Sequence, residues 1–214
     1  MRLILREKRI EEREVAGSSL ENQVFVSSKP IGETISFIEG LKRLPTFNRR
    51  HTKPAGIYTS SAYEAGQGKI SSQWADFMRS ENYGNFGSIV MFKVDPSAKI
   101  AIVESKEDYR ELLDTYGTNP IQPGIGGDRN LNWDGVAYDF DAFRITRDGY
   151  DAISHMSYGW DVEQTVFFNT GVLKLIPRKQ DSEIDAPKGS PEYLNQKYNY
   201  MEDFDTKMNS YGDY

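Results

Sequence analysis

Cysteine is absent from this 214-residue chain, and histidine occurs only twice, as His51 and His155. Without thiols the protein cannot form disulfides, use a thiolate nucleophile or bind zinc through cysteine. Two histidines argue against a histidine-rich metal centre, and a histidine-based catalytic triad would have to use one of them. We therefore expect no metal cofactor.

Long apolar runs are also lacking. The first 15 residues hold only a short apolar stretch followed by dense alternating charge, whereas a secretory signal needs about 7–15 apolar residues in a row. We expect neither a signal peptide nor a membrane span, and the absence of cysteine suits a reducing compartment. The sequence thus predicts a cytoplasmic protein.

Positive charge is scarce, since the formal net charge is -6. Neutralising phosphates needs a basic surface, so nucleic acid is a less expected partner than protein. One stretch departs from this balance: residues 41–53 carry Lys42, Arg43, Arg49, Arg50, His51 and Lys53 without an acidic residue. This stretch is the candidate anion-binding segment.

Periodicity predicts one α+β domain over residues 1–177. Strands are expected at Gln23–Val26, Ser88–Val94, Tyr150–Ile153 and Thr165–Phe168, helices at Thr34–Leu44 and from Ser71 or Ser72 to Met78, and a helical turn at Phe140–Phe143. After Pro177 the apolar period stops. Residues 178–214 are acidic and Tyr-rich, which predicts an extended arm or disordered tail that docks on a partner.

The segment Lys53–Ser61 combines groups that suit a nucleotide-shaped ligand. Gly56 allows close approach of a ligand to the backbone, and Tyr58 offers a ring for stacking. Thr59, Ser60 and the following serine offer hydroxyls. A plain strand that ends in a Ser-rich turn would have the same pattern.

A second motif is Trp160-Asp-Val-Glu-Gln164, which opens an apolar strand. Residues i and i+2 of an extended segment share a face, so Asp161 and Glu163 are expected to point together at one ligand. A carboxylate fixed in this way can hydrogen-bond a ribose hydroxyl and stabilise positive charge on the sugar. The competing interpretation is a solvated acidic turn.

Together the two motifs resemble the Arg, Ser-Thr-Ser, Glu-x-Glu arrangement of ADP-ribosyltransferases. Residues 45–176 also resemble a group of small, uncharacterised bacterial and phage proteins. Those proteins share a Lys-Pro-x-Gly-aromatic-x-Ser segment, a Trp-bearing helix, a Tyr-Asp-x-Ile segment and a Trp-Asp-x-Glu ending. In a phage-encoded protein the expected location would be the host cytoplasm.

The resemblance implies a mixed, mostly antiparallel two-sheet sandwich with peripheral helices and a cleft for NAD, which is a substrate here. It implies Glu163 as catalytic carboxylate, Asp161 in acceptor choice, Tyr58 stacked on nicotinamide and Ser60 in support. Gly56 and Thr59 would complete this side of the cleft. The acceptor would be a macromolecule, most of all a protein.

The resemblance leaves the pyrophosphate contact open. Arg49 and Arg50 are preferred for it, and Arg43 is an alternative. His51 could fill the place of the histidine in the poly-ADP-ribose-polymerase-like branch, but the glycine that follows that histidine is absent here. Asp161 also departs from the Glu or Gln that many such transferases have.

Two other functions fit the sequence. One is a non-enzymatic binding module, such as a virion component or an inhibitor of a host protein, with the Tyr-rich tail as its docking arm. The other is a toxin that acts on nucleotides or RNA through residues 43–53.

Overall fold

The structure, a computed structural model, describes residues 22–41, 53–81, 83, 86–118, 130–153 and 160–204. Its strands are β1 (Gln23–Ser27), β2 (Ile57–Gly66), β3 (Lys69–Ser72), β4 (Ser88–Val94), β5 (Ile100–Val103), β6 (Gly117–Thr118), β7 (Asn130–Leu131), β8 (Ala142–Ile145), β9 (Gln164–Phe167) and β10 (Leu173–Leu175). Its helices are α2 (Ile31–Gly40), α3 (Gln73–Ser80), α4 (Lys106–Tyr116), α5 (Trp133–Asp139), α6 (Arg147–Ile153) and α7 (Pro191–Tyr198).

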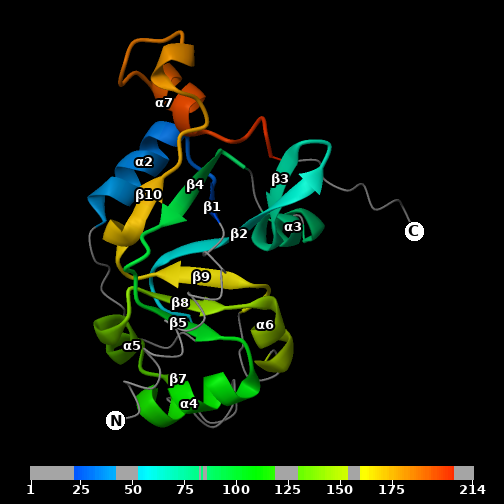
Figure 1. Ribbon diagram of the computed structural model, residues 1–214, viewed down its shortest axis with the longest axis vertical. Helices are drawn as coiled ribbons and strands as arrows, with labels where there is room; N and C mark the ends of the chain where they lie inside the picture. Colours follow the sequence, from blue (N-terminus) through cyan, green and yellow to red (C-terminus); the bar gives the residue numbers. More distant parts are fainter. Residues whose placement is uncertain are drawn as a thin grey trace.

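Eight of the described strands form one curled sheet in the order β10-β4-β1-β2-β9-β8-β5, with β3 attached to β2. Neighbouring strands are antiparallel except β5 and β8, which are parallel. Helices α2 and α7 lie beside the β10-β4-β1 end, and α4, α5 and α6 surround the β9-β8-β5 end (Figure 1). The α+β class and the mostly antiparallel strands are confirmed. Strands β6 and β7 form a separate two-stranded sheet, and the expected sandwich of two packed sheets is not confirmed.

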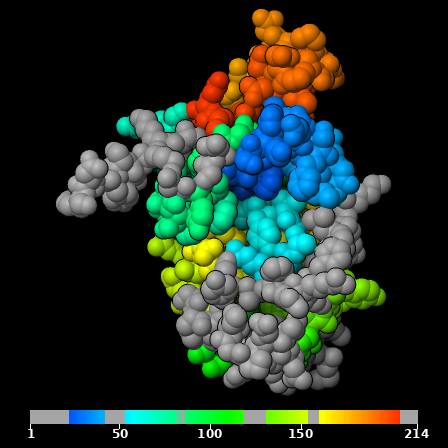
Figure 2. Space-filling view, turned by 180° about the vertical axis from the view of Figure 1, so that it is seen from behind, coloured from blue at the N-terminus to red at the C-terminus, as the bar shows by residue number. Residues whose placement is uncertain are grey.

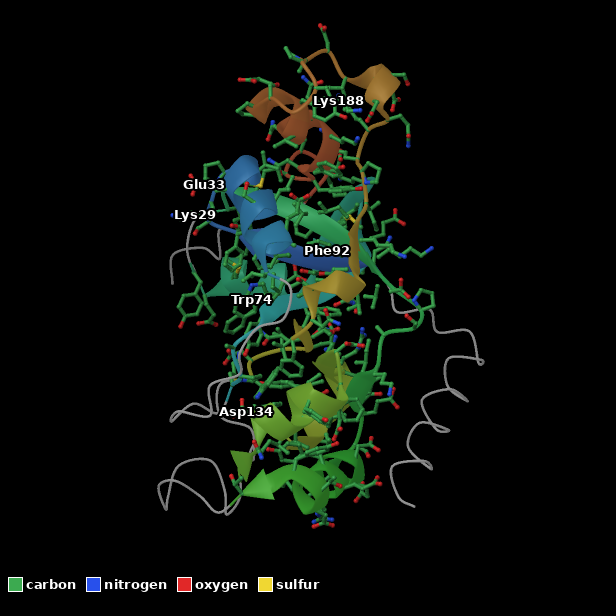
Figure 3. All side chains as sticks on the ribbon, turned by 90° about the vertical axis from the view of Figure 1, so that its left-hand side faces the viewer. Lys29, Glu33, Trp74, Phe92, Asp134 and Lys188 are labelled. Atoms are coloured by element: carbon green, nitrogen blue, oxygen red, sulfur yellow. The ribbon has the colours of Figure 1, made fainter. Side chains whose placement is uncertain are left out.

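Strand β4 is buried on both faces, which explains its continuous apolar sequence. Val90, Phe92 and Val94 face the core under α2, while Ile89 and Met91 face a second core on the opposite side of the sheet. Alternate residues of a strand point to opposite faces, so burial of both faces requires apolar residues throughout. Figure 3 shows Phe92 in the part of the sheet beside α2, with Glu33 on α2 and Lys29 just before it.

Side-chain caps set the starts of α3, α4, α5 and α7. The Ser72 hydroxyl accepts a hydrogen bond from the Ala75 N–H at 3.3 Å at the start of α3. The Ser105 hydroxyl does the same for the Asp108 N–H at 3.2 Å at the start of α4. Such caps satisfy one of the N–H groups that a helix start leaves unpaired. The predicted serine cap of α3 is confirmed, at Ser72.

Two predicted elements are wrong. Tyr150–Ile153, expected as a strand, is the end of helix α6, and Phe140–Phe143, expected as a helical turn, runs into strand β8. Tyr150 and Ile153 both contact the core beside α4, α5 and α6. A short apolar run fits a strand or a buried helix equally well, and tertiary packing decides between them.

Residues 178–204, expected to be an extended or disordered tail, instead fold back onto the sheet. The segment passes through α7, which packs against α2, and in Figure 2 it caps the molecule next to α2. Tyr200 donates its N–H to the Ile89 carbonyl at 2.8 Å, and Phe204 is buried beside Met91. The buried side chains of this segment are too widely spaced to give an apolar periodicity, so the sequence pattern did not predict that it packs on the sheet. Residues 205–214 lie outside the described part.

None of the described helices is long and apolar enough to cross a bilayer.

We expect Phe204→Ala to lower the free energy of unfolding by about 3 kcal/mol, because a large buried ring leaves a cavity when truncated. The Phe204 side chain is only 2% exposed. Urea unfolding followed by circular dichroism measures the change. The matched control is Phe37→Ala on α2, where the ring is 56% exposed and the loss should stay below about 0.5 kcal/mol. Equal, small losses in both variants would show that residues 178–204 do not contribute to the free energy of unfolding.

Candidate functional site

The candidate site forms at a gap in the pairing of β2. This strand pairs with β9 at Ile57–Thr59, with β1 at Ser60 and Ser61, and with β3 from Ala62 onward. Ser61 therefore lies between the stretches that pair with β9 and β3. Glu163 immediately precedes β9 and Gln73 immediately follows β3, so the ends of both strands meet at Ser61.

The Glu163 carboxylate fills this gap. Its Oε2 accepts the Ser61 backbone N–H at 3.3 Å, and its Oε1 accepts the Ser61 hydroxyl at 2.9 Å. The Glu163 N–H in turn donates to the Gln73 side-chain carbonyl at 3.4 Å. A buried backbone N–H needs an acceptor, and here a carboxylate takes the place of a neighbouring strand. Glu163 is only 4% exposed.

Arg144 of β8 balances this buried charge. Its Nη2 lies 3.2 Å from Glu163 Oε1 and donates to the Ser61 hydroxyl at 3.0 Å. The side chains of Arg144 and Glu163 are 14% and 5% exposed. A buried carboxylate is costly unless it is paired and hydrogen-bonded, and both conditions are met here.

Gln23 of β1 extends the polar row across the sheet. Its Nε2 donates to the Ser61 hydroxyl at 3.3 Å, and its Oε1 accepts the Thr59 hydroxyl at 2.7 Å. Gln23 and Thr59 are both buried. This network fixes the rotamers of the groups that hold Glu163, and Thr59 contributes to the site through Gln23.

An open cavity of about 470 Å³ lies against the Glu163 carboxylate. Its walls are formed by Ser61, Tyr63, Gln73, Asp76, Arg144, Arg147 and Glu163. This volume falls within the range of about 300–1,000 Å³ that is usual for small-molecule sites. The arrangement can therefore hold an oriented carboxylate against a bound small molecule.

Tyr58 and Ser60, predicted to line the same cleft as Glu163, lie on the opposite face of the sheet. The Tyr58 ring packs 6.1 Å from that of Trp160, and the Ser60 hydroxyl accepts the Trp74 N–H at 3.3 Å. Burial raises the pKa of Tyr58 well above its usual value. Side chains alternate along a strand, so Thr59 and Ser61 face Glu163 and their neighbours do not.

Asp161 does not point with Glu163 either. The chain bends at Val162 and Glu163 instead of continuing as a strand, and the Asp161 carboxylate lies 3.8 Å from Lys53 Nζ. This Lys53 ammonium also lies over the Trp160 ring at 5.2 Å and donates to the Gln164 side chain at 3.2 Å. Burial lowers the pKa of Lys53, and Asp161 opposes that shift.

Gly56 has a structural reason for lacking a side chain. A Cβ at this position would meet Val166 Cγ2 at 2.2 Å and the Phe167 carbonyl oxygen at 3.0 Å. The space that was expected to admit a ligand is therefore occupied by β9. Arg43, Arg49, Arg50 and His51 lie outside the described residues, and their assignment to the pyrophosphate stays a prediction.

The sequence analysis missed Arg144, Gln73, Gln23 and Arg147. Arg144 had a signal, because it is the single charged residue in the apolar strand Ala142–Ile145. Charge inside a buried strand usually has a partner, but the sequence does not name it. Gln73 and Gln23 carry no comparable signal.

Within the described ranges, no group of three or more His, Asp or Glu side chains could hold a metal ion. Comparison with protein-family models, with curated proteins and with solved structures finds no match to this chain.

We expect Arg144→Met to lower the free energy of unfolding by about 3 kcal/mol, because it leaves the Glu163 carboxylate buried without its cation. Adding Glu163→Gln should recover at least about 1 kcal/mol of that loss, since the two residues interact directly. Urea unfolding of the two single variants and the double variant gives the coupling energy.

The control cycle uses the ion pair between Lys174 and Asp95, in which Lys174 is 67% exposed. Its coupling should stay below about 1 kcal/mol, as is usual for solvent-exposed pairs. Additive losses in the Arg144 and Glu163 cycle would show that the buried pair does not form.

Proposed function

We propose that the protein transfers ADP-ribose from NAD to a macromolecular acceptor and releases nicotinamide, with Glu163 at the reacting centre. The observation that carries this proposal is the Glu163 carboxylate itself. It is buried, held by Ser61 and Arg144, and lies on the wall of a cavity of about 470 Å³. The resemblance of residues 53–61 and 160–164 to ADP-ribosyltransferase motifs supplies the substrate class.

In the proposed reaction the bond between C1′ of the ribose and the nicotinamide nitrogen breaks. Its electron pair moves to the nicotinamide ring, which leaves as a neutral molecule, and positive charge develops on the sugar. A nucleophile of the acceptor forms the new bond to C1′ and loses its proton. With water as acceptor the product is free ADP-ribose. A preoriented carboxylate stabilises the sugar cation more than it stabilises the ground state.

The contacts of Glu163 divide its two oxygens between two tasks. Oε1 accepts the Ser61 hydroxyl and forms the ion pair with Arg144, and these two contacts hold the group in place. Oε2 accepts the Ser61 N–H at 3.3 Å, and a carboxylate oxygen can accept two hydrogen bonds. The remaining capacity of Oε2 suits a ribose hydroxyl. Arg144 is a positioning residue in this proposal.

The proposal reassigns two roles. Ser61 takes the supporting role expected of Ser60, because its hydroxyl contacts Glu163. Tyr63 takes the ring-stacking role expected of Tyr58, because it lines the cavity and is 42% exposed. Asp161, paired with Lys53, keeps no assigned part in the reaction.

The non-enzymatic alternative loses part of its support. Its docking arm was to be the tail, but residues Tyr193, Tyr200 and Phe204 are buried against the rest of the protein. The toxin alternative depends on residues 43–53, of which only Lys53 is described.

We expect Glu163→Gln to reduce nicotinamide release from NAD by about 100-fold or more, because the amide keeps the size but removes the charge. Chromatography of nicotinamide measures the rate, and calorimetry should show that NAD still binds. A wild-type protein that releases no nicotinamide with any protein acceptor would contradict the proposed reaction. Equal rates in wild type and Glu163→Gln would make the carboxylate structural.

The neighbouring serines provide a second, matched comparison. Ser61→Ala should slow the release of nicotinamide about tenfold or more, because it removes a hydrogen bond to a charged group. Ser60→Ala should leave the rate unchanged, because that hydroxyl faces the Trp74 N–H on the opposite side of the sheet. The same loss in both variants would place the reaction away from Glu163.

A further inference from the structure

A second cavity of about 610 Å³ adjoins the one at Glu163. The two cavities share Tyr63, Gln73, Asp76 and Arg147 as wall residues, so they form two lobes of one groove. The second lobe lies between β2, α3 and α6, and its walls also include Phe77, Tyr150 and Asp151. Neither sequence motif predicted this lobe.

The charged groups of the second lobe differ in what they already bind. Asp76 is engaged, because it pairs with Arg79 and accepts the hydroxyls of Ser71 and Tyr63. Arg147, in contrast, has no ion pair or side-chain hydrogen bond within the described part of the chain, and Asp151 likewise has none. Both are exposed. The lobe thus offers one uncommitted cation and one uncommitted carboxylate.

We propose that the second lobe binds the adenosine-phosphate half of the dinucleotide, an inference that rests on the proposed function of the first lobe. Arg147 belongs to both lobes, which is where the pyrophosphate of a dinucleotide spanning them would lie. A guanidinium binds phosphate oxygens through paired N–H groups. Phe77 and Tyr150, which line only this lobe, supply faces or edges for a purine, and Asp151 can accept from ribose hydroxyls.

The composition of the lobe favours a nucleotide over a side chain of the acceptor. A cationic acceptor such as lysine or arginine would find only Asp151 uncommitted in this lobe, because Asp76 is paired with Arg79, and it would meet the positive charge of Arg147 at the border of the lobes. A nucleotide needs an anion contact beside aromatic rings, and the lobe has both. The groove therefore commits the enzyme to dinucleotide substrates over the isolated nicotinamide riboside.

Two variants test this assignment. Arg147→Ala removes the cation, and Ser80→Trp places a ring in the second lobe, which Ser80 lines at the exposed end of α3. We expect each to lower kcat/KM for NAD by about ten- to hundredfold, Arg147→Ala because it removes a hydrogen bond to a charged group and Ser80→Trp because its ring fills the lobe. For nicotinamide riboside, which has no phosphate or adenosine, Ser80→Trp should leave kcat/KM within about twofold of wild type, because Ser80 does not line the cavity at Glu163.

The matched control is Arg110→Ala, which removes an exposed arginine of α4 that lines neither lobe. It should leave both substrates unaffected. Binding of AMP, followed by calorimetry, gives a readout that does not depend on turnover. AMP should bind wild type and Arg110→Ala equally, and bind Arg147→Ala about tenfold more weakly.

The outcomes separate this inference from the proposed reaction. If the protein turns over no NAD but binds AMP through Arg147, the reaction is wrong and the nucleotide lobe stands. If NAD is turned over and Arg147→Ala and Ser80→Trp change neither AMP binding nor the preference for NAD, the nucleotide assignment is overturned. Loss of transfer to a protein acceptor with unchanged NAD hydrolysis in these variants would assign the lobe to the acceptor instead.

Discussion

The arrangement of the whole sheet depends on how β2 changes partners along its length. Its first residues pair with β9, its middle pairs with β1 and its end pairs with β3. A strand that passes between partners leaves backbone groups without a neighbour where one partner ends and the next begins. At Ser61 that need is met by the Glu163 carboxylate. The candidate site thus lies where a carboxylate replaces a missing strand partner in the sheet.

This origin explains why the site is rigid and nearly neutral. Arg144, Ser61 and Glu163 come from three strands or strand ends that are hydrogen-bonded to one another. Because Arg144 contacts Oε1, the pair brings little net charge into the sheet. The free energy lost by burying both ions is offset only while this geometry holds. The ion pair and the hydrogen bonds from Ser61 therefore hold the carboxylate in one orientation at the wall of the cavity.

Sequence periodicity predicted many of the strands and helices, but it did not predict which face of the sheet carries the candidate site. The strand at Ser88–Val94 could be predicted because its apolar run is continuous. The hydroxyls of β2 were recognised as a group, but Ser60 was expected to face Glu163 where Ser61 does. A shift of one residue along a strand moves every side chain to the other face. The bend at Val162 had the same effect on Asp161. Neither is visible in residue types alone.

Long-range partners were the second limit. Arg144 and Ser61 are 83 positions apart in the sequence, and Ser61 and Glu163 are 102 apart. Only the register between β8, β9 and β2 brings them together, and no local pattern encodes that register. Residues 178–204 escaped prediction for a related reason, since Tyr200 and Phe204 are single anchors whose partners belong to β3 and β4. The function itself stays a proposal, because its motifs are short.

The close packing of Gly56 against β9 bears on the position of the Glu163 carboxylate, although glycine itself has no side chain. A Cβ at Gly56 would lie 2.2 Å from Val166 Cγ2 and 3.0 Å from the Phe167 carbonyl oxygen, so even a methyl group would force Val166 or the backbone of β9 to shift. Glu163 precedes β9 by one residue, so a shift of β9 would alter the distance between its carboxylate and the Ser61 hydroxyl. The close approach of two backbones at Gly56 therefore affects the position of an acid that lies just before the neighbouring strand.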